Sequence, residues 1–190
     1  TVYYGCQNIT VMMNSSAYNA NNGALIVGGL NNKLASNEFF GNWNAGTALW
    51  AAGNTTVRDA GIYNNNRSEF NGIGNIGDAK GSVFIGDAYN LLGTTISVNP
   101  DARFIAEVID TQIHYTGLGS NTEKVGVYLD ESLGLLPAND KNIIRIDNIG
   151  FIAQDYAIDM SSCDITNLKV ILGNNTYCNV QEKSIKPPSA

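Results

Sequence analysis

The feature that most constrains the fold is a near repeat with a period of 23 residues in the first third of the chain. Residues 23–45 (GALIVGGLNNKLASNEFFGNWNA) align without a gap to residues 46–68 (GTALWAAGNTTVRDAGIYNNNRS), and residues 1–22 join the same columns. Ile26 then falls on Leu49, and Asn31 falls on Asn54. A period of roughly 20–50 residues indicates a stack of equal supersecondary units.

The repeating unit has the composition of short strands joined by tight turns. Asn and Gly are frequent in it, and both residues form helices poorly and turns readily. Its apolar runs are short, as in residues 24–27 (ALIV) and 48–52 (ALWAA), which is typical of strands. We therefore predict an all-β solenoid with about 23 residues per coil. Like residues of successive coils should stack at the strand spacing of about 4.8 Å.

The predicted stacking assigns the columns of the repeat to the inside, the outside and a corner. The inward columns are Tyr3/Ile26/Leu49, Val11/Leu34/Val57 and Ser16/Phe39/Ile62. By the alternation of side chains along a strand, the column Tyr4/Val27/Trp50 should point outward. Asn8, Asn31 and Asn54 should form an Asn ladder at a corner, because Asn tolerates the left-handed conformation that a corner needs.

Regularity decreases along the chain. Residues 1–100 contain regular coils with an inserted loop at residues 69–80, after which Gly81–Gly86 resembles Gly46–Ala51 at a displacement of 35 residues. Residues 101–182 either continue the solenoid with longer loops or change to an antiparallel sheet, and we favour continuation. Residues 183–190 form an exit strand or a frayed tail. The strand-like runs of the second half are residues 103–115, 125–129, 142–146, 157–160 and 168–172.

Composition excludes several classes of function. The chain has a formal net charge of −6 and no basic stretch, which argues against nucleic acid as a partner. No apolar run reaches about 18 residues, so no membrane span is expected. No motif points to a cofactor or a metal. Because Thr1 already lies inside a predicted strand, we expect the chain to be a fragment of a longer protein; a cap supplied by a partner subunit is the alternative.

The cysteines do not suggest a disulfide framework. Cys6, Cys163 and Cys178 are odd in number and widely spaced. We expect buried free thiols, since Cys packs as a small hydrophobe; a bridge between Cys163 and Cys178 is the less favoured alternative.

The repeat also carries a resemblance to a known family. The segments GCQNITV (Gly5–Val11) and GALIVGGLNN (residues 23–32), with the Asn column in phase, resemble right-handed parallel β-helices of the pectate-lyase-like class. Within that class the chain is most similar in character to bacteriophage tailspikes and host-adsorption appendages. The resemblance covers residues 1–100 well and residues 101–190 in style alone. It implies a homotrimer, in a virion tail or extracellular, that binds bacterial surface polysaccharide or teichoic acid and in some members degrades it.

The resemblance also implies where catalysis would sit, because enzymes of this class carry acidic residues on one outer face or between subunits. Glu107 and Asp110 are the candidates, together with Arg103 and with His114, the single histidine. Glycoside hydrolysis needs two carboxyl groups about 5–10 Å apart, and a lyase needs a base and a cation. Strand alternation separates these residues onto two faces, so a bend would be needed to bring them together. Ordinary solvated charges on an outer strand are the simpler interpretation.

Aromatic residues suggest a second kind of site. Sugars stack on aromatic rings, so Trp43, Trp50 and Tyr63 are candidates for a saccharide-binding surface. Burial of the same rings against a neighbouring subunit of a trimer is the alternative. Three functional hypotheses follow: a phage appendage that binds or degrades host glycans, a secreted polysaccharide lyase or hydrolase of the same fold, and a non-enzymatic stalk or adhesin.

Overall fold

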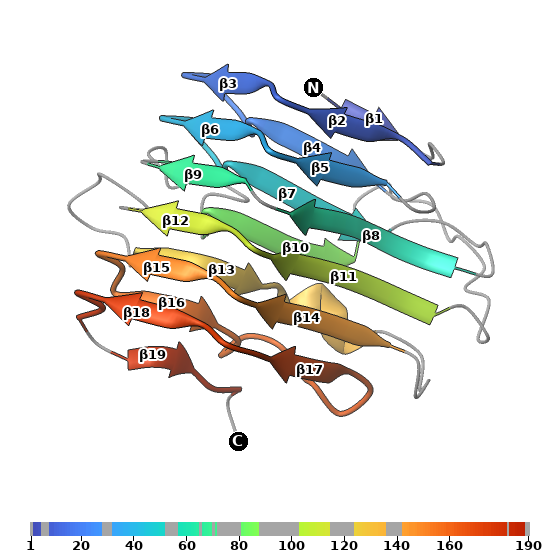
Figure 1. Cartoon of the computed structure of the whole chain (residues 1–190). Coiled ribbons are helices and arrows are strands. Elements are labelled where there is room, and N and C mark those ends of the chain that lie inside the picture. The colour runs from blue at the N-terminus through green and yellow to red at the C-terminus, as the bar shows by residue number, and fades with distance from the viewer. Residues whose placement is uncertain are drawn as a thin grey trace.

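The computed structural model describes residues 2–4, 8–27, 32–51, 57–64, 66–69, 71, 81–87, 103–114, 124–135, 142–181 and 183–188. In these residues all strands belong to three parallel sheets (Figure 1). The first sheet has the order β1 (Val2–Tyr4), β4 (Ala24–Val27), β7 (Thr47–Ala51), β10 (Val83–Asp87), β13 (Val125–Leu129), β16 (Tyr156–Asp159) and β19 (Lys183–Lys186).

The second and third sheets have six strands each. The second sheet consists of β2 (Thr10–Met12), β5 (Lys33–Ala35), β8 (Val57–Asn64), β11 (Arg103–Ile109), β14 (Ile143–Asp147) and β17 (Lys169–Leu172). The third sheet consists of β3 (Ser15–Ala17), β6 (Glu38–Phe40), β9 (Arg67–Glu69), β12 (Gln112–His114), β15 (Gly150–Ile152) and β18 (Thr176–Cys178). A short 3-10 helix, η3 (Glu131–Leu135), follows β13, and no helix in the described part of the chain is long and apolar enough to cross a membrane.

The chain passes through the three sheets in a constant order, with one strand in each, and we call one such passage a coil. Each strand pairs in parallel with the corresponding strands of the coils before and after it, so the coils stack from the N-terminus to the C-terminus (Figure 1). The protein is therefore all-β with parallel sheets, which is compatible with the predicted solenoid. The strands of residues 103–186 join the same three sheets, and among the described strands every pair is parallel, as continuation of the first half requires.

The predicted register holds between the first two coils. Tyr3 pairs with Ile26, Val11 with Leu34 and Ser16 with Phe39. Ile26 also pairs with Leu49 in the first sheet. Residues Ile26, Leu34, Phe39 and Leu49 are all buried, as expected for inward columns.

The register then changes in the third coil, where the constant period was wrong. Leu34 pairs with Tyr63 instead of Val57, and Phe39 pairs with Ser68 instead of Ile62. Side-chain hydrogen bonds between these coils join residues 29 positions apart. The reason is the length of β8: its eight residues extend beyond β5, and β5 pairs with the later ones. A single period cannot follow a coil whose strand is longer than its neighbours.

Two further boundaries differ from the prediction. The predicted displacement of 35 residues would place Phe84 beside Leu49. In the structure the displacement is 36 residues, so Val83 pairs with Thr47 and Ile85 pairs with Leu49. Because side chains alternate along a strand, a shift of one residue exchanges the two faces. Glu69 belongs to β9 rather than to the inserted loop, and of residues 70–80 only Asn71, which is buried, is described.

The run from Arg103 to Tyr115 is two strands rather than one. Asp110, with φ of 52°, lies between β11 and β12 in the left-handed conformation and turns the chain from the second sheet to the third. Met13, Ser36 and Asn148 have the same conformation at the equivalent corner of other coils. Strands β15 and β18 have three residues each and were not predicted.

Apolar side chains fill the space between the sheets and also cover part of the outside. The main cluster includes Ile85 and Leu129 of the first sheet, Val108 of the second and Phe151 of the third. A separate cluster, on the other face of the first sheet, contains Ala48, Phe84 and Tyr128, with Val27 packed against it. The predicted outward column is therefore half-buried at Val27. The side chains of Tyr4 and Trp50 lie outside the described residues.

Two Asn ladders border the third sheet, one before its strands and one after them. The ladder before the strands runs Asn14–Asn37–Asn66, and the ladder after them runs Asn19–Asn42–Asn71. In each ladder the Oδ1 atom accepts the backbone N–H of the Asn one coil earlier, at 3.0 and 2.8 Å in the first and 3.2 and 3.0 Å in the second. The Nδ2 atoms of Asn37, Asn42, Asn66 and Asn71 donate to backbone carbonyls of earlier coils.

The predicted ladder of Asn8, Asn31 and Asn54 stays a prediction. Asn8 has the left-handed conformation expected at a corner, with φ of 56°. Asn31 and Asn54 lie outside the described residues.

Candidate functional site

The outward side of the third sheet carries two rows of polar and aromatic residues over four adjacent strands. One row is Ser15, Glu38, Arg67 and Gln112, and the other is Ala17, Phe40, Glu69 and His114. The residues between these rows, Phe39, Ser68 and Ile113, are buried on the inward side. Three-residue strands framed by Asn ladders thus present two side chains per coil on a regular surface.

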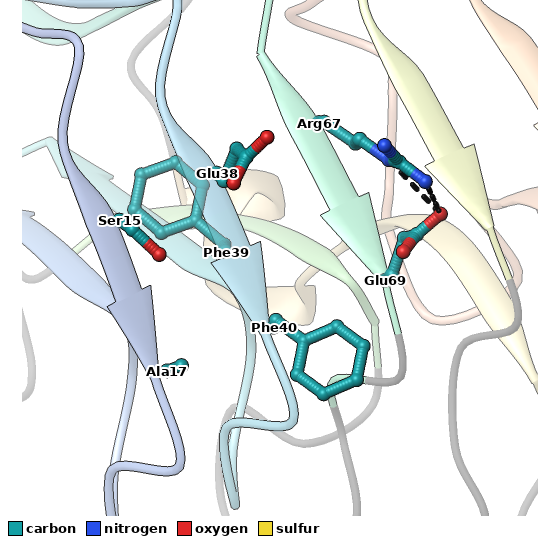
Figure 2. A pocket seen from close by; sticks show the side chains of 7 residues that line it. All are labelled: Ser15, Ala17, Glu38, Phe39, Phe40, Arg67 and Glu69. Carbon is teal, nitrogen blue, oxygen red and sulfur yellow. Dashed lines mark hydrogen bonds and ion pairs between the residues drawn. The ribbon is translucent and has the colours of Figure 1, made fainter.

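A pocket of about 250 Å³ lies in this surface, over β3, β6 and β9 (Figure 2). It is lined by Ser15, Ala17, Glu38, Phe39, Phe40, Arg67 and Glu69. Glu38 lies at the beginning of β6 and Phe40 at its end, while Arg67 and Glu69 lie on the neighbouring strand (Figure 2). We call the two rows and this pocket the third-sheet face.

Glu69 organises the polar part of the face. One of its oxygens, Oε1, accepts hydrogen bonds from Arg67 Nε at 3.0 Å and Nη2 at 2.7 Å. The same oxygen lies 2.9 Å from His114 Nδ1, which requires the proton of the imidazole to be on Nδ1. The hydrogen bond and the charge of Glu69 raise the pKa of Arg67. The Arg67 guanidinium is therefore held as a cation beside a carboxylate that has two partners.

Aromatic rings extend the face at the turn that follows the third sheet. Tyr18 is 75% exposed and packs against Phe40 in a T-shaped pair, with ring centroids 5.3 Å apart and an interplanar angle of 77°. Gly41 lies beneath the Tyr18 ring with φ of +60°, and a Cβ there would be 2.9 Å from that ring. Trp43 is 46% exposed in the turn before β7, where its backbone N–H donates to the backbone carbonyl of Asn19 at 2.8 Å. Tyr18 thus adds an exposed ring next to Phe40 of the pocket, and Trp43 is a second exposed ring in the turn after β6.

The predicted catalytic residues are divided between two sheets. Glu107 lies on β11 opposite Arg145, and the charges of Glu107 and Asp110 add to the effect of Asp147 in raising the pKa of Arg145. Asp110 accepts a hydrogen bond from Asn148 at 2.8 Å. His114 lies on β12 of the third sheet, beside Glu69. Arg103 begins β11, and its side chain lies outside the described residues.

The predicted saccharide residues lie on three different elements. Trp43 is in the turn after β6, Trp50 is in β7 of the first sheet and Tyr63 is in β8 of the second. Trp43 is the one of the three whose side chain is described, and it is exposed in the turn that follows β6 of the third sheet.

The sequence contained a signal for this face that a constant period obscures. Pairs of asparagines five residues apart occur at positions 14 and 19, 37 and 42, and 66 and 71, each enclosing a strand of the third sheet. Aligning these pairs puts Glu38 beside Arg67 and Phe40 beside Glu69, as the structure does. With the constant period Glu69 falls instead in an inserted loop.

The described cysteines do not line the pocket of this face. Cys163 and Cys178 are both free, which excludes the bridge between them, and burial raises the pKa of the Cys163 thiol to about 12. Cys163 is buried as predicted, whereas Cys178 is exposed at the end of β18. Within the described residues no group of three or more His, Cys, Asp or Glu side chains could hold a metal ion.

Comparison with protein-family models, curated proteins and solved structures finds no match to this chain.

Proposed function

We propose that the chain is a segment of a right-handed parallel β-helix, from a phage tailspike or host-adsorption appendage, whose third-sheet face binds bacterial surface polysaccharide or teichoic acid. The observation that carries the binding function is the combination of the polar pocket over β3, β6 and β9 with the exposed rings of Tyr18 and Trp43. The β-helix is supported by the constant order of three parallel sheets. The phage origin rests on the sequence resemblance.

The chemistry of the face suits a sugar chain. Ligand sites combine apolar and aromatic surface with a few placed polar groups, which here are Glu38, Arg67 and Gln112. Carbohydrate hydroxyls both donate and accept hydrogen bonds, and the guanidinium and carboxylate groups offer both partners. The face repeats from coil to coil, so it fits a polymer that lies along several strands better than a compact ligand. Binding by such a face needs no catalysis; a hydrolase or lyase of the same fold and a structural stalk remain the alternatives.

Direct binding tests this proposal. Purified capsular polysaccharide, O-antigen and teichoic acid are titrated against the chain, with binding followed by calorimetry. We expect binding to one of these glycans, and Trp43→Ala should weaken it about tenfold, since stacking on one ring contributes roughly 1–1.5 kcal/mol.

Met13→Ala is the matched control, because Met13 is 78% exposed at a different corner of the coil, between the second and third sheets. It should leave the affinity unchanged. Equal affinity of the wild type and the Trp43 variant, or absence of binding to all three glycans, would contradict the function. Cleavage of the bound glycan would favour the enzymatic alternative.

A further inference from the structure

We infer that the pocket of the third-sheet face selects a saccharide unit that carries an ammonium group, such as an amino sugar or an aminoacyl-substituted sugar. This inference rests on the proposed saccharide function and adds the chemical class of the ligand. Three features carry it: the charge balance in the pocket, the position of Glu38, and the aromatic ring beside it.

The guanidinium of Arg67, which lines the pocket, is already paired with the carboxylate of Glu69. The Arg67 side chain is 56% exposed, but two of its nitrogens bond the same Glu69 oxygen that His114 contacts. Glu69 is 15% exposed and balances the charge of Arg67. A carboxylate or phosphate group would have to compete with Glu69 for Arg67, so this pocket favours the cationic substituents of a bacterial glycan over its anionic groups.

Glu38 is the carboxylate that this arrangement leaves over. It is exposed and lies on β6 directly opposite Arg67, and its charge adds to that of Glu69 in raising the pKa of Arg67, yet among the described residues its carboxylate has no hydrogen bond and no ion pair within 4.0 Å. The lining of the pocket therefore has two carboxylates and one guanidinium, which leaves one negative charge in excess. That excess charge attracts a cation and repels an anion.

Phe40 supplies the second recognition element. It lies two residues after Glu38 on the same face of β6, lines the same pocket and packs against Tyr18 with the two ring planes 77° apart. Ammonium groups are recognised by the faces of aromatic rings, and a neighbouring carboxylate adds to the attraction. A carboxylate and an aromatic ring on one side of a pocket thus form a site for an ammonium group, while Arg67 can donate its remaining N–H groups to sugar hydroxyls.

The test compares two oligosaccharides that differ in this group alone. In mildly acidic buffer a chitosan oligosaccharide carries ammonium groups, and the fully N-acetylated oligosaccharide of the same length does not. We expect the wild type to bind the chitosan oligosaccharide about fivefold more tightly, given the usual strength of exposed ion pairs and cation–π contacts. The preference should shrink at about 1 M salt, where charges are screened beyond about 3 Å.

Two variants of exposed or half-exposed residues locate the effect, and a third controls for charge. Glu38→Gln and Phe40→Leu should each reduce the preference to about twofold or less. Glu131→Gln, which removes an exposed carboxylate on η3, should keep it.

Equal binding of the two oligosaccharides, tighter binding of the acetylated one, or binding of neither would overturn the ammonium inference. A preference that survives Glu38→Gln would overturn it too. The saccharide function is judged separately by the effect of Trp43→Ala on bacterial glycans, so the two can fail independently.

Discussion

Individual asparagines hold successive coils together through hydrogen bonds from their side chains to the backbone. Each buried ladder Asn satisfies two backbone groups of the preceding coil, because its Oδ1 accepts a backbone N–H there and its Nδ2 donates to a backbone carbonyl there. A buried polar group without a partner destabilises the fold by about 1–3 kcal/mol, so replacing a ladder Asn should lower the free energy of unfolding. The high Asn content of the first hundred residues thus has a structural cause.

Asn42→Ala should lower the free energy of unfolding by about 2–4 kcal/mol. Asn42 is fully buried, and its amide bonds Asn19, Ser16 and Asn71. Urea denaturation measures the change. Asn19→Ala is the control at the exposed end of the same ladder and should cost less than about 1 kcal/mol. Equal effects of the two substitutions would show that the buried amide is not the source of stability.

At the scale of the strands, Asp147 connects β14 to the coil that follows. Its Oδ2 accepts from Arg145 Nη2 at 2.5 Å, and its Oδ1 accepts the backbone N–H of Asn174 at 2.9 Å. These hydrogen bonds lower the pKa of Asp147 below its ordinary value of 3.8, with the Arg145 bond as the largest cause. A carboxyl group whose pKa is lower in the folded state stabilises the fold above its unfolded pKa, and this contribution is lost as the pH falls.

The free energy of unfolding should therefore decrease as the pH is lowered below about 4, and Asp147→Asn should reduce that decrease. Arg145→Gln should have the same effect, because it removes the main cause of the lowered pKa. Denaturant titrations at several pH values give the dependence of the unfolding free energy on pH for the wild type and for each variant. If the two variants keep the wild-type slope, the pair does not contribute to acid stability.

The strands also show which parts of the fold could be predicted from the sequence and which could not. The register of the first two coils and the burial of Ile26, Leu34 and Leu49 follow from the alignment of like residues. The register of the third coil does not follow from that alignment, because β8 is longer than β5, the strand with which it pairs. Strands such as β15 are too short to give a periodic signal, and their position depends on stacking against β12 and β18.

Two residues of this region had been named from the sequence. Trp43, predicted to bind saccharide, is exposed in the turn after β6, and His114, predicted to be catalytic, contacts Glu69. Its partner Glu69 was missed, because the change of register is what places β9 beside β12. Glu107 is a near neighbour of His114 in sequence, but the turn at Asp110 separates β11 of the second sheet, which carries Glu107, from β12 of the third sheet, which carries His114.

At the scale of the whole molecule, the proposal of a phage appendage predicts a trimer. Sedimentation equilibrium should give a mass of about three times the 20.3 kDa of the chain. Lateral association would also cover apolar side chains on the outside of the first sheet, where Leu25, Val27 and Tyr156 are partly buried. A stable monomer would favour the free-standing enzyme of the same fold instead.

The central claim is that glycans bind to the third-sheet face, and a crystal structure of the chain with a bound oligosaccharide tests it most directly. We predict sugar rings over Tyr18, Phe40 and Trp43, with hydroxyls within hydrogen-bonding distance of Arg67 or Glu38. A sugar bound on the second sheet at Glu107, or on the outside of the first sheet near Val27, would contradict the claim.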